Sequence, residues 1–283
     1  MPLIINTNID SLNAQRQLSA VNIRLARTFQ RLSSGLRINR AADDAAGLAI
    51  AEELQATVRG SRKAIQNAQD GIALMNVADG ASKSIMSNLQ RMRELTKQAA
   101  NDTYGSEERT QIKNELDQLK SEITRVANAA NFNGIKLLNG SAPANVRIQI
   151  GSGNDTTATS TDVLDIASAL SNLTASTGGL VLGSTDVSTN TLANGLASRI
   201  DSALTTVNSQ LSRLGAYQNR LEGIVSNLEV SIQNASAARS RIEDADIAAT
   251  TAALTQQQIV QQATLSVLSQ ANTAPQGALS LLR

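Results

Sequence analysis

The side chains of this sequence that could do chemistry are mainly carboxylates in short clusters. Asp43–Asp44 and Glu52–Glu53 are adjacent acid pairs, and residues 243–246 contain three more acids. A general acid and a general base need a cleft and a fixed separation, which neighbours along one helix do not provide. Calcium sites need more oxygen ligands, at loop spacing, than residues 243–246 supply. We therefore expect these carboxylates to form salt bridges or helix caps.

The residue types missing from the sequence exclude most catalytic and metal chemistry. There is no His, which removes the usual general base and the commonest metal ligand, and no Cys, which excludes disulfides and thiolate sites. A glycine-containing loop at residues 151–153 follows a strand-like segment, but no long helix starts there to bind phosphate. The sequence thus predicts no enzyme, no catalytic or metal-binding residue and no cofactor.

Composition favours long helical surfaces over a compact globule. Only two Phe and two Tyr occur in 283 residues, so burial must come from Leu, Ile, Val and Ala. A net charge of +1 gives no support for nucleic-acid binding or for an acidic partner, and none is predicted. No stretch is long and apolar enough to insert in a membrane, and the start lacks the basic and apolar regions of a signal peptide.

Apolar residues recur every three or four positions in four segments, which predicts helices that pack on one another. The first segment contains Leu18, Val21, Leu25, Phe29 and Leu32. The others span about residues 54–92, 112–126 and 200–242, and only Gln218 and Arg239 interrupt the last of them. This pattern predicts a mainly α fold, a rod of coiled coil or helical bundle with a small β-hairpin region.

Turn and strand signals separate these helices. Residues 101–105 (NDTYG) predict a turn, after which Ser106 would cap the third helix and leave it antiparallel to the second. Asn-Gly dipeptides at 133–134 and 139–140 predict further turns. Residues 146–150 alternate like a half-buried strand, and residues 162–166 are the expected partner strand.

The two ends of the sequence differ from its body in charge. Residues 1–42 contain six arginines and one acid, whereas residues 247–282 contain no charged side chain. The last segment has helical apolar spacing but carries five glutamines in its middle. A solvated helix carries charge on its outer face, and a membrane span excludes so many glutamines. We expect the two ends to lie side by side, with the 243–246 acids near the arginines and other copies of the chain covering both.

The composition of the ends also predicts when they fold. Ala, Thr and Gln bury little apolar surface within one chain, while ordering each residue costs about 1–2 kcal/mol of backbone entropy. We therefore expect both ends to be disordered in the free subunit and to fold on incorporation into an assembly. Glutamines at the helix contact, such as Gln261, would hydrogen-bond across helices and set their register.

Several blocks at both ends resemble bacterial flagellin. In the first half they are residues 5–8 (INTN), 31–39 (RLSSGLRIN), 43–50 (DDAAGLAI) and 132–138 (FNGIKLL). Near the end they are residues 240–246 (SRIEDAD), 270–272 (QAN) and 279–283 (LSLLR). The resemblance covers about residues 4–140 and 197–283, and the short middle is that of a compact flagellin without large outer domains.

The resemblance implies a subunit that polymerises with itself into the extracellular bacterial flagellar filament used for swimming. It implies an inner coiled-coil filament-core domain at 1–43 and 240–283, an outer helical bundle at 44–140 and 196–239, and a β-hairpin with a short variable surface region at 141–195. Packing of the inner domain would use the five apolar residues of the first segment together with Leu254, Gln261, Leu265 and Leu268. It also implies type III export without a cleaved signal peptide, and contacts with an export chaperone, a filament cap and hook-associated proteins.

One block resembles the flagellin segment that Toll-like receptor 5 recognises. It comprises residues 89–95 (LQRMREL), and Glu115 corresponds to a further recognition position. The resemblance implies receptor recognition by Arg91, Leu95 and Glu115. The helical spacing within this block equally predicts core packing.

Three other functions compete with a filament subunit. A hook–filament junction protein shares the flagellin N-terminal pattern, but the match at residues 279–283 argues against it. A protease insertion, present in some flagellins, needs a zinc-binding His pair that this chain lacks. A membrane-active amphipathic helix uses a basic face, which residues 247–282 do not have.

Overall fold

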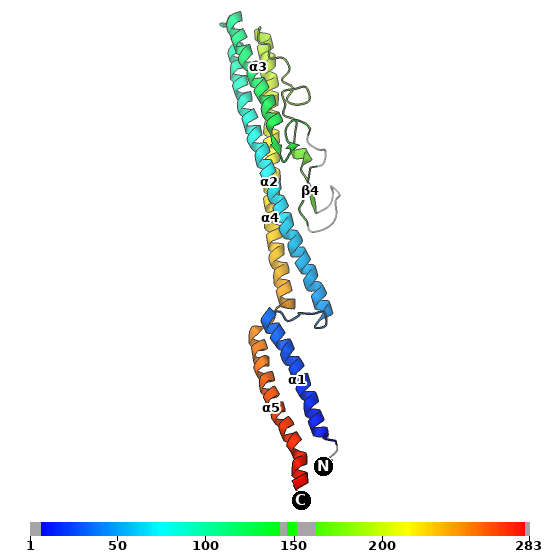
Figure 1. Cartoon of the computed structure of the whole chain (residues 1–283). Coiled ribbons are helices and arrows are strands. Elements are labelled where there is room, and N and C mark those ends of the chain that lie inside the picture. The colour runs from blue at the N-terminus through cyan, green and yellow to red at the C-terminus, as the bar shows by residue number, and fades with distance from the viewer. Residues whose placement is uncertain (1–6, 142–145, 152–161, 281–283) are drawn as a thin grey trace. The chain divides into compact units, whose positions relative to one another are not determined.

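The computed structural model describes residues 7–141, 146–151 and 162–280, with side chains as far as residue 273. The fold is mainly α-helical, which confirms the predicted fold class (Figure 1). The helices of the described residues are α1 (Ile9–Ser34), α2 (Ala45–Ala99), α3 (Ser106–Ala129), α4 (Asn190–Glu243) and α5 (Ile247–Ser280), with a short 3-10 helix η1 (Ala167–Ala169). The chain divides into two compact units, a terminal unit of residues 1–56 with 233–283 and a middle unit of residues 57–232.

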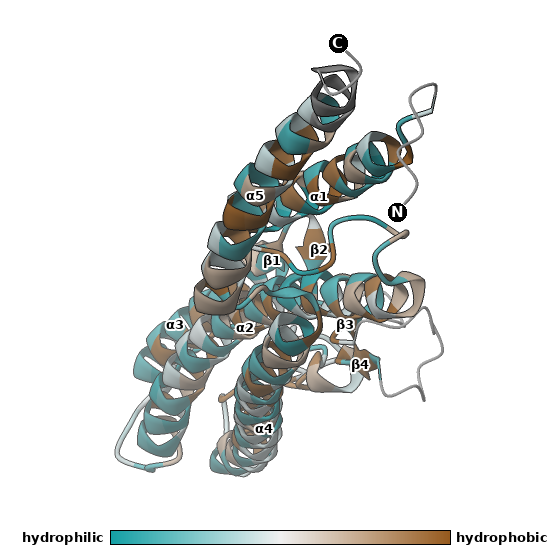
Figure 2. Ribbon diagram, turned by 90° about the horizontal axis from the view of Figure 1, so that it is seen from below, coloured by the Kyte–Doolittle hydropathy of each residue, from teal (hydrophilic) through white to brown (hydrophobic). Residues whose placement is uncertain are grey.

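In the terminal unit, α1 and α5 lie side by side and antiparallel, so the prediction that the two ends meet is confirmed. Their facing residues repeat at alternating intervals of three and four, which is the pattern of a two-stranded coiled coil. We call these buried and half-buried residues the seam: Ser11, Ala14, Leu18, Val21, Leu25, Thr28 and Leu32 on α1, and Thr250, Leu254, Gln257, Gln261, Thr264, Leu268 and Ala271 on α5. Hydrophobic residues also occur away from the seam on both helices (Figure 2).

Polar side chains at both ends and in the middle of the seam fix the register of α1 against α5. The hydrogen bonds are Asn8 Nδ2 to the Ala271 carbonyl (2.7 Å), Ser11 Oγ to Asn272 Oδ1 (2.7 Å), Gln261 Nε2 to Asn22 Oδ1 (2.8 Å) and Thr28 Oγ1 to Gln257 Oε1 (2.9 Å). Slipping one helix past the other by a turn would separate all four pairs, so polar residues in this contact select one alignment.

The connectors that join α1 to α2 and α4 to α5 pair with each other in the terminal unit. The Arg37 amide donates to the Glu243 carbonyl at 2.6 Å, and the Ala245 amide donates to the Gly35 carbonyl at 2.9 Å. Gly35 has a left-handed backbone (φ 73°), which ends α1 and turns the chain toward this contact. The acids of residues 243–246 thus lie beside Arg37, as expected. The Glu243 carboxylate, however, pairs with Arg239 at 2.7 Å and not with an arginine of residues 1–42.

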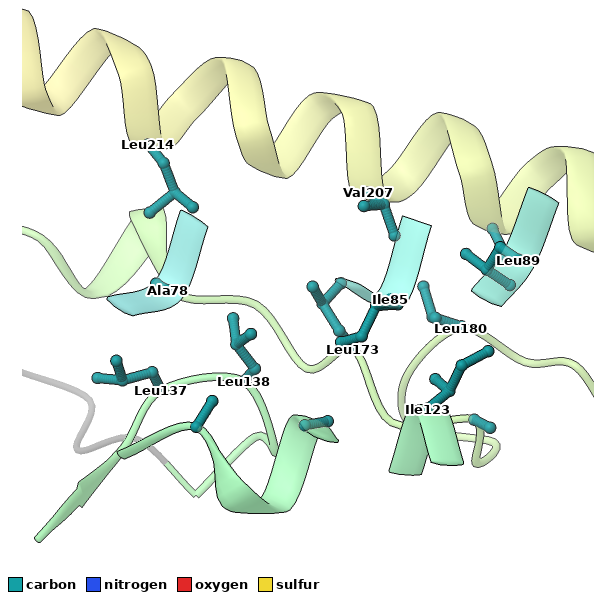
Figure 3. Packing of buried hydrophobic residues seen from close by; sticks show 14 of the residues in the cluster. Ala78, Ile85, Leu89, Ile123, Leu137, Leu138, Leu173, Leu180, Val207 and Leu214 are labelled. Carbon is teal, nitrogen blue, oxygen red and sulfur yellow. The ribbon is translucent and has the colours of Figure 1, made fainter. Parts of the chain in front are cut away.

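The middle unit has its core between α2, α3, α4 and the segment that follows α3. Val207 and Leu214 of α4 point toward Ala78 and Ile85 of α2, and all four are fully buried (Figure 3). Buried side chains from α3 and the following segment complete the cluster, among them Ile123, Leu137, Leu138, Leu173 and Leu180. The core is therefore mostly aliphatic, as the scarcity of aromatic residues predicts.

The long fourth helix begins earlier than its apolar spacing predicts. Its first residue is Asn190, ten positions before Ile200. Thr189 accepts a hydrogen bond from the Leu192 amide at 3.3 Å, which satisfies one of the free donors of the first turn. Gln218, which interrupts the apolar pattern, donates to Asn76 Oδ1 of α2 at 3.0 Å, so it too contacts a neighbouring helix.

Two short hairpins follow α3. Strand β1 (Asn131–Phe132) pairs with β2 (Ile135–Lys136), and both turn residues, Asn133 and Gly134, have positive φ angles (47° and 82°), as an Asn-Gly hairpin turn requires. Strand β3 (Arg147–Gln149) pairs antiparallel with β4 (Val163–Asp165). The second hairpin confirms the predicted strand pair, whereas β1 and β2 were expected only as a turn.

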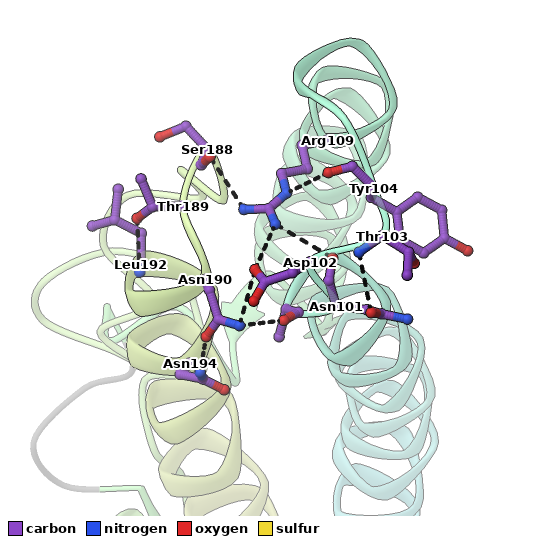
Figure 4. Close-up of polar contacts among 11 residues, drawn as sticks. Asn101, Asp102, Thr103, Tyr104, Arg109, Ser188, Thr189, Asn190, Leu192 and Asn194 are labelled. Atoms are coloured by element: carbon purple, nitrogen blue, oxygen red, sulfur yellow. Dashed lines mark hydrogen bonds and ion pairs between the residues drawn. The ribbon is translucent and has the colours of Figure 1, made fainter.

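Arg109 joins the turn between α2 and α3 to the segment that enters α4 (Figure 4). Its side chain is only 10% exposed. It donates to the carbonyls of Tyr104 (3.2 Å), Asn101 (3.3 Å) and Ser188 (3.3 Å) and pairs with the Asp102 carboxylate (3.3 Å). Asn190 adds a hydrogen bond to the Ala100 carbonyl at 2.5 Å, so two side chains satisfy the carbonyls at the end of α2.

The predicted cap at Ser106 is wrong. Ser106 is already the first helical residue of α3, and Gly105 occupies the cap position without a side-chain hydrogen bond. Arg109, from inside the helix, instead donates to the carbonyls of Asn101 and Tyr104 in the preceding turn.

Candidate assembly surface

Exposed hydrophobic side chains concentrate on the two terminal helices. Within the described part of the chain, nine of the fourteen large hydrophobic side chains that are well exposed belong to α1 or α5. They are Ile9, Leu12, Ile23 and Phe29 on α1, and Ile247, Ile259, Val260, Leu265 and Val267 on α5. Exposed apolar side chains concentrated in this way mark interaction sites in water-soluble domains.

A groove runs between α1 and α5 on one side of the seam. Its volume is ≈ 680 Å³. The α5 wall is Ile259, Val260, Ala263, Thr264 and Val267, and the α1 wall is Asp10, Asn13, Ala14 and Gln17. No residue of the α5 wall carries a charge, so this wall suits an apolar occupant.

The predicted packing residues divide into two groups in the structure. Leu18, Val21, Leu25, Leu32, Leu254, Gln261 and Leu268 lie in the seam. Phe29 and Leu265 lie outside it and are each 49% exposed. Each follows a seam residue directly, Thr28 or Thr264, and one step along a helix turns a side chain by about 100°. These two residues are therefore free to contact another molecule.

The acid pair Asp43–Asp44 accepts backbone hydrogen bonds in the terminal unit. Asp44 Oδ1 accepts from the Gly47 amide at 2.9 Å and caps α2. Asp43 Oδ2 accepts from the amides of Asn39 and Arg40, each at 3.2 Å. These backbone hydrogen bonds, with the nearby positive charge of Arg31, lower the pKa of Asp43. The expectation of a helix cap is confirmed for Asp44, whereas Asp43 bonds to amides that precede it, in the turn ahead of α2.

The residues of the proposed receptor segment occupy different environments in the middle unit. Arg91 is 53% exposed and pairs with Glu115 (46% exposed) at 3.0 Å and with Glu94 at 3.2 Å. Hydrogen bonding to Glu115 raises the pKa of Arg91. Leu95, in contrast, is 3% exposed and belongs to the core, as do Leu89 and Met92. The structure thus brings Arg91 and Glu115 together at the surface and places Leu95 beneath it.

Within the described residues the structure shows neither a metal-ligand cluster nor a membrane-spanning helix. Among the residues described here, no group of three or more acidic side chains could hold a metal ion. A search of the same residues finds no helix with the length and apolarity to cross a membrane.

Apart from Gln261, sequence reasoning missed the polar residues of the seam. Ser11, Thr28, Gln257 and Thr264 occupy seam positions but are not apolar, so a search for apolar spacing passes over them. The signal that finds them is the seven-residue repeat itself, because each lies seven residues from another seam position.

Comparison with known protein families matches nearly all of the helical sequence. Residues 5–143 match the family model of the bacterial flagellin N-terminal helical region, and residues 197–282 match that of the C-terminal helical region. A flagellar filament core protein of Brachyspira hyodysenteriae is 40% identical over 290 residues, covering 99% of this chain and all of the relative. A flagellin of Halalkalibacterium halodurans is 39% identical over 281 residues, with the same coverage.

The flagellin of Bacillus subtilis is 38% identical, with 99% of both chains covered. Among solved structures, the crystal structure of Bacillus cereus flagellin is 29% identical and covers 58% of this chain and 88% of that one, with a TM-score of 0.45. The family matches and the full-length relatives agree with the blocks found at both ends of the sequence. The chain therefore belongs to the bacterial flagellin family, whose members are structural, non-enzymatic subunits that assemble into the flagellar filament.

Proposed function

We propose that this chain polymerises with copies of itself through α1 and α5 to form the extracellular filament of a bacterial flagellum. The observation that carries the proposal is the combination of an uncharged α5 with exposed apolar residues along it. Ile259, Leu265 and Val267 are 61%, 49% and 57% exposed in one subunit. Only a surface that is covered after assembly combines such exposure with a complete lack of charge.

The domain assignment follows from this function. We propose that residues 1–43 and 240–283 form the inner, filament-core domain and that residues 44–140 and 196–239 form an outer helical bundle. The segment 141–195 would then be the variable surface region. The antiparallel contact of α1 with α5 supports an inner coiled-coil layer, because it pairs the first and the last helix of the chain with each other.

Growth of purified subunit into long filaments tests the proposal. Short filament fragments would be added as seeds, and elongation would be measured by electron microscopy and sedimentation. Long homopolymers are the expected result. A hook–filament junction protein, the alternative function, would stop after short oligomers or fail to extend the seeds.

The free subunit is expected to have unprotected ends. The seam contains Ser, Thr, Ala or Gln at eight of its fourteen positions, so α1 and α5 bury little apolar area against the entropy of ordering about 60 residues (26 and 34 in the two helices). Amide hydrogen exchange of dilute monomer should show fast exchange in both helices and strong protection in the assembled filament. Slow exchange of residues 9–34 in the monomer would contradict this prediction, while the core of the middle unit serves as the protected reference.

Exposed apolar ends imply helper proteins before and during assembly. We propose that an export chaperone covers α5 before export and that filament cap and hook-associated proteins contact the polymer ends. The support is physical: Ile247 and Val267, like their neighbours on α5, would promote aggregation if they stayed uncovered in the cell.

Recognition by Toll-like receptor 5 is proposed for the surface around Arg91 and Glu115. Both side chains are accessible, and Leu95 would act from below by supporting α2. Replacing Arg91 by Ala should weaken receptor activation about tenfold, because truncating an interface arginine typically removes at least one strong contact. Dose–response in a receptor-reporter cell line would measure the change.

The matched control is Arg125→Ala. Arg125 is also an exposed, ion-paired arginine of the middle unit, bonded to Glu122 at 2.6 Å. Equal responses from the Arg91 and Arg125 variants would remove the receptor proposal, and an unchanged unfolding midpoint in both would show that the fold is intact.

A further inference from the structure

We propose that the α1–α5 pair carries two complementary flanks, and that the groove flank of one subunit receives the opposite flank of the next. This inference rests on the proposed self-polymerisation and adds which surfaces meet. The groove flank is the groove described above. We call the opposite side the ridge flank, a name for its position only, because part of it lines a separate shallow hollow of ≈ 430 Å³ on α1. It comprises Gln15, Ser19, Asn22, Ala26, Phe29 and Ser33 of α1 with Leu265 of α5.

Coiled-coil geometry places these two sets on opposite sides of the seam. Asp10 and Gln17 immediately precede the seam residues Ser11 and Leu18, whereas Phe29 immediately follows a seam residue. Each seven-residue repeat has two seam positions, and the second lies three residues after the first. The residue just before the first seam position lies on one flank of the helix pair, and the residue just after the second lies on the opposite flank. The groove confirms half of this assignment directly, because Asp10 and Gln17 line it together with α5.

The same rule holds on α5. Val260 and Val267 precede the seam residues Gln261 and Leu268 and line the groove. Leu265 follows the seam residue Thr264 and therefore belongs to the other side. In an antiparallel pair, the preceding residues of both helices share one flank and the following residues share the other, so Leu265 and Phe29 belong to the same flank.

The distribution of charge on α1 indicates what covers the ridge flank. Helix α1 contains Arg16, Arg24, Arg27 and Arg31, yet the ridge flank has no charged residue over its whole length. An uncharged strip on an otherwise basic helix is suited to an uncharged partner. The α5 wall of the groove, with Val260 and Val267 exposed, is such a partner and is present in every copy.

Symmetry favours ridge-to-groove contact over contact between like flanks. Groove to groove or ridge to ridge would give closed two-fold dimers. Ridge to groove joins two different surfaces of the same chain, so each added copy leaves one ridge and one groove free, and an open helical polymer can grow. Phe29, as the one aromatic residue on α1, would supply the largest apolar area to this contact.

Cysteine crosslinking tests the pairing, because the chain contains no native Cys. Ala263→Cys labels the groove, and Ser19→Cys, Ala26→Cys and Ser33→Cys label the ridge at seven-residue intervals. A thiol crosslinker with a spacer of about 10 Å bridges the rise between neighbouring ridge positions, so the three together cover about 40 Å of axial offset between copies, the length of α1 (26 residues). Double variants carrying one ridge and one groove cysteine would be assembled, crosslinked and separated on denaturing gels.

At least one double variant should give a ladder of covalent oligomers, while each single variant stays monomeric. Dimers from Ala263→Cys alone, or from a ridge variant alone, would overturn the inference, and so would normal filaments in which no ridge position links to the groove. In each of these cases wild-type growth would still support self-polymerisation. As a second measurement, Phe29→Ala should raise the subunit concentration needed for growth about tenfold, and growth at the wild-type concentration would also count against the inference.

Discussion

Replacing Arg109 by Met is expected to lower the free energy of unfolding of the middle unit by about 3 kcal/mol. Methionine keeps much of the apolar stem of the arginine but cannot donate a hydrogen bond. The carbonyls of Asn101, Tyr104 and Ser188 would then lose a donor in a place where the replaced side chain was only 10% exposed. Each buried acceptor left without a partner costs about 1–3 kcal/mol, less where water can enter.

The geometry of the arginine explains why one residue carries this effect. A planar guanidinium with five donors can bond several carbonyls at fixed angles, and Arg109 uses it to join two chain segments far apart in sequence. The Asp102 carboxylate contributes little of the stability, because its side chain is 83% exposed. Arg109→Lys should therefore give an intermediate loss, since one ammonium group cannot reach all three carbonyls at once.

Denaturant unfolding, followed by circular dichroism, would measure the change. Arg125→Met is the matched control, because Arg125 lies on the same helix, is 67% exposed and bonds only to Glu122. The control should unfold almost as the wild type does, since exposed ion pairs add little to stability. Similar midpoints for the Arg109 and Arg125 variants would show that the carbonyl contacts are not a main support of this end of the unit.

The features that the sequence predicts well are those set by repeats along the chain. Apolar spacing of three and four locates the long helices, because one face of each must be buried. Alternation at residues 146–150 locates a strand, and β3 pairs with the expected partner. The lack of charge in residues 247–282 marks the surface on which exposed apolar side chains are found.

The features that the sequence does not predict depend on contacts between distant residues. Arg109 is one of 25 basic residues, and nothing in its neighbourhood shows that three carbonyls will surround it. Ser106 carries a good local signal for a cap, yet a contact from inside the helix replaces that cap. Phe29 fits the apolar rhythm of α1 as well as Leu25 does, and only the exact seven-residue repeat separates the exposed Phe29 from the half-buried Leu25.

Replacing Ser266 by Asp is expected to stop filament growth at concentrations where the wild type polymerises. Ser266 is exposed and lies seven residues after Ile259, on the side of α5 that points away from the seam. The side chain touches nothing that the fold of one subunit needs, so the monomer should be unaffected. If neighbouring copies cover this side, the new carboxylate loses its water without gaining a partner, which costs several kcal/mol.

Such a penalty corresponds to a rise of at least a hundredfold in the subunit concentration needed for growth, because about 1.4 kcal/mol changes an equilibrium tenfold. Ser266→Asn is the matched control, since asparagine has nearly the size and shape of aspartate and differs mainly in charge. Sedimentation of seeded reactions would measure both variants. Growth of the Asn variant with failure of the Asp variant would show that the uncharged character of α5 is a requirement of assembly. Equal growth of both would mean that this side of the helix stays in water, and the partner-covered surface would then have to be confined to the flanks.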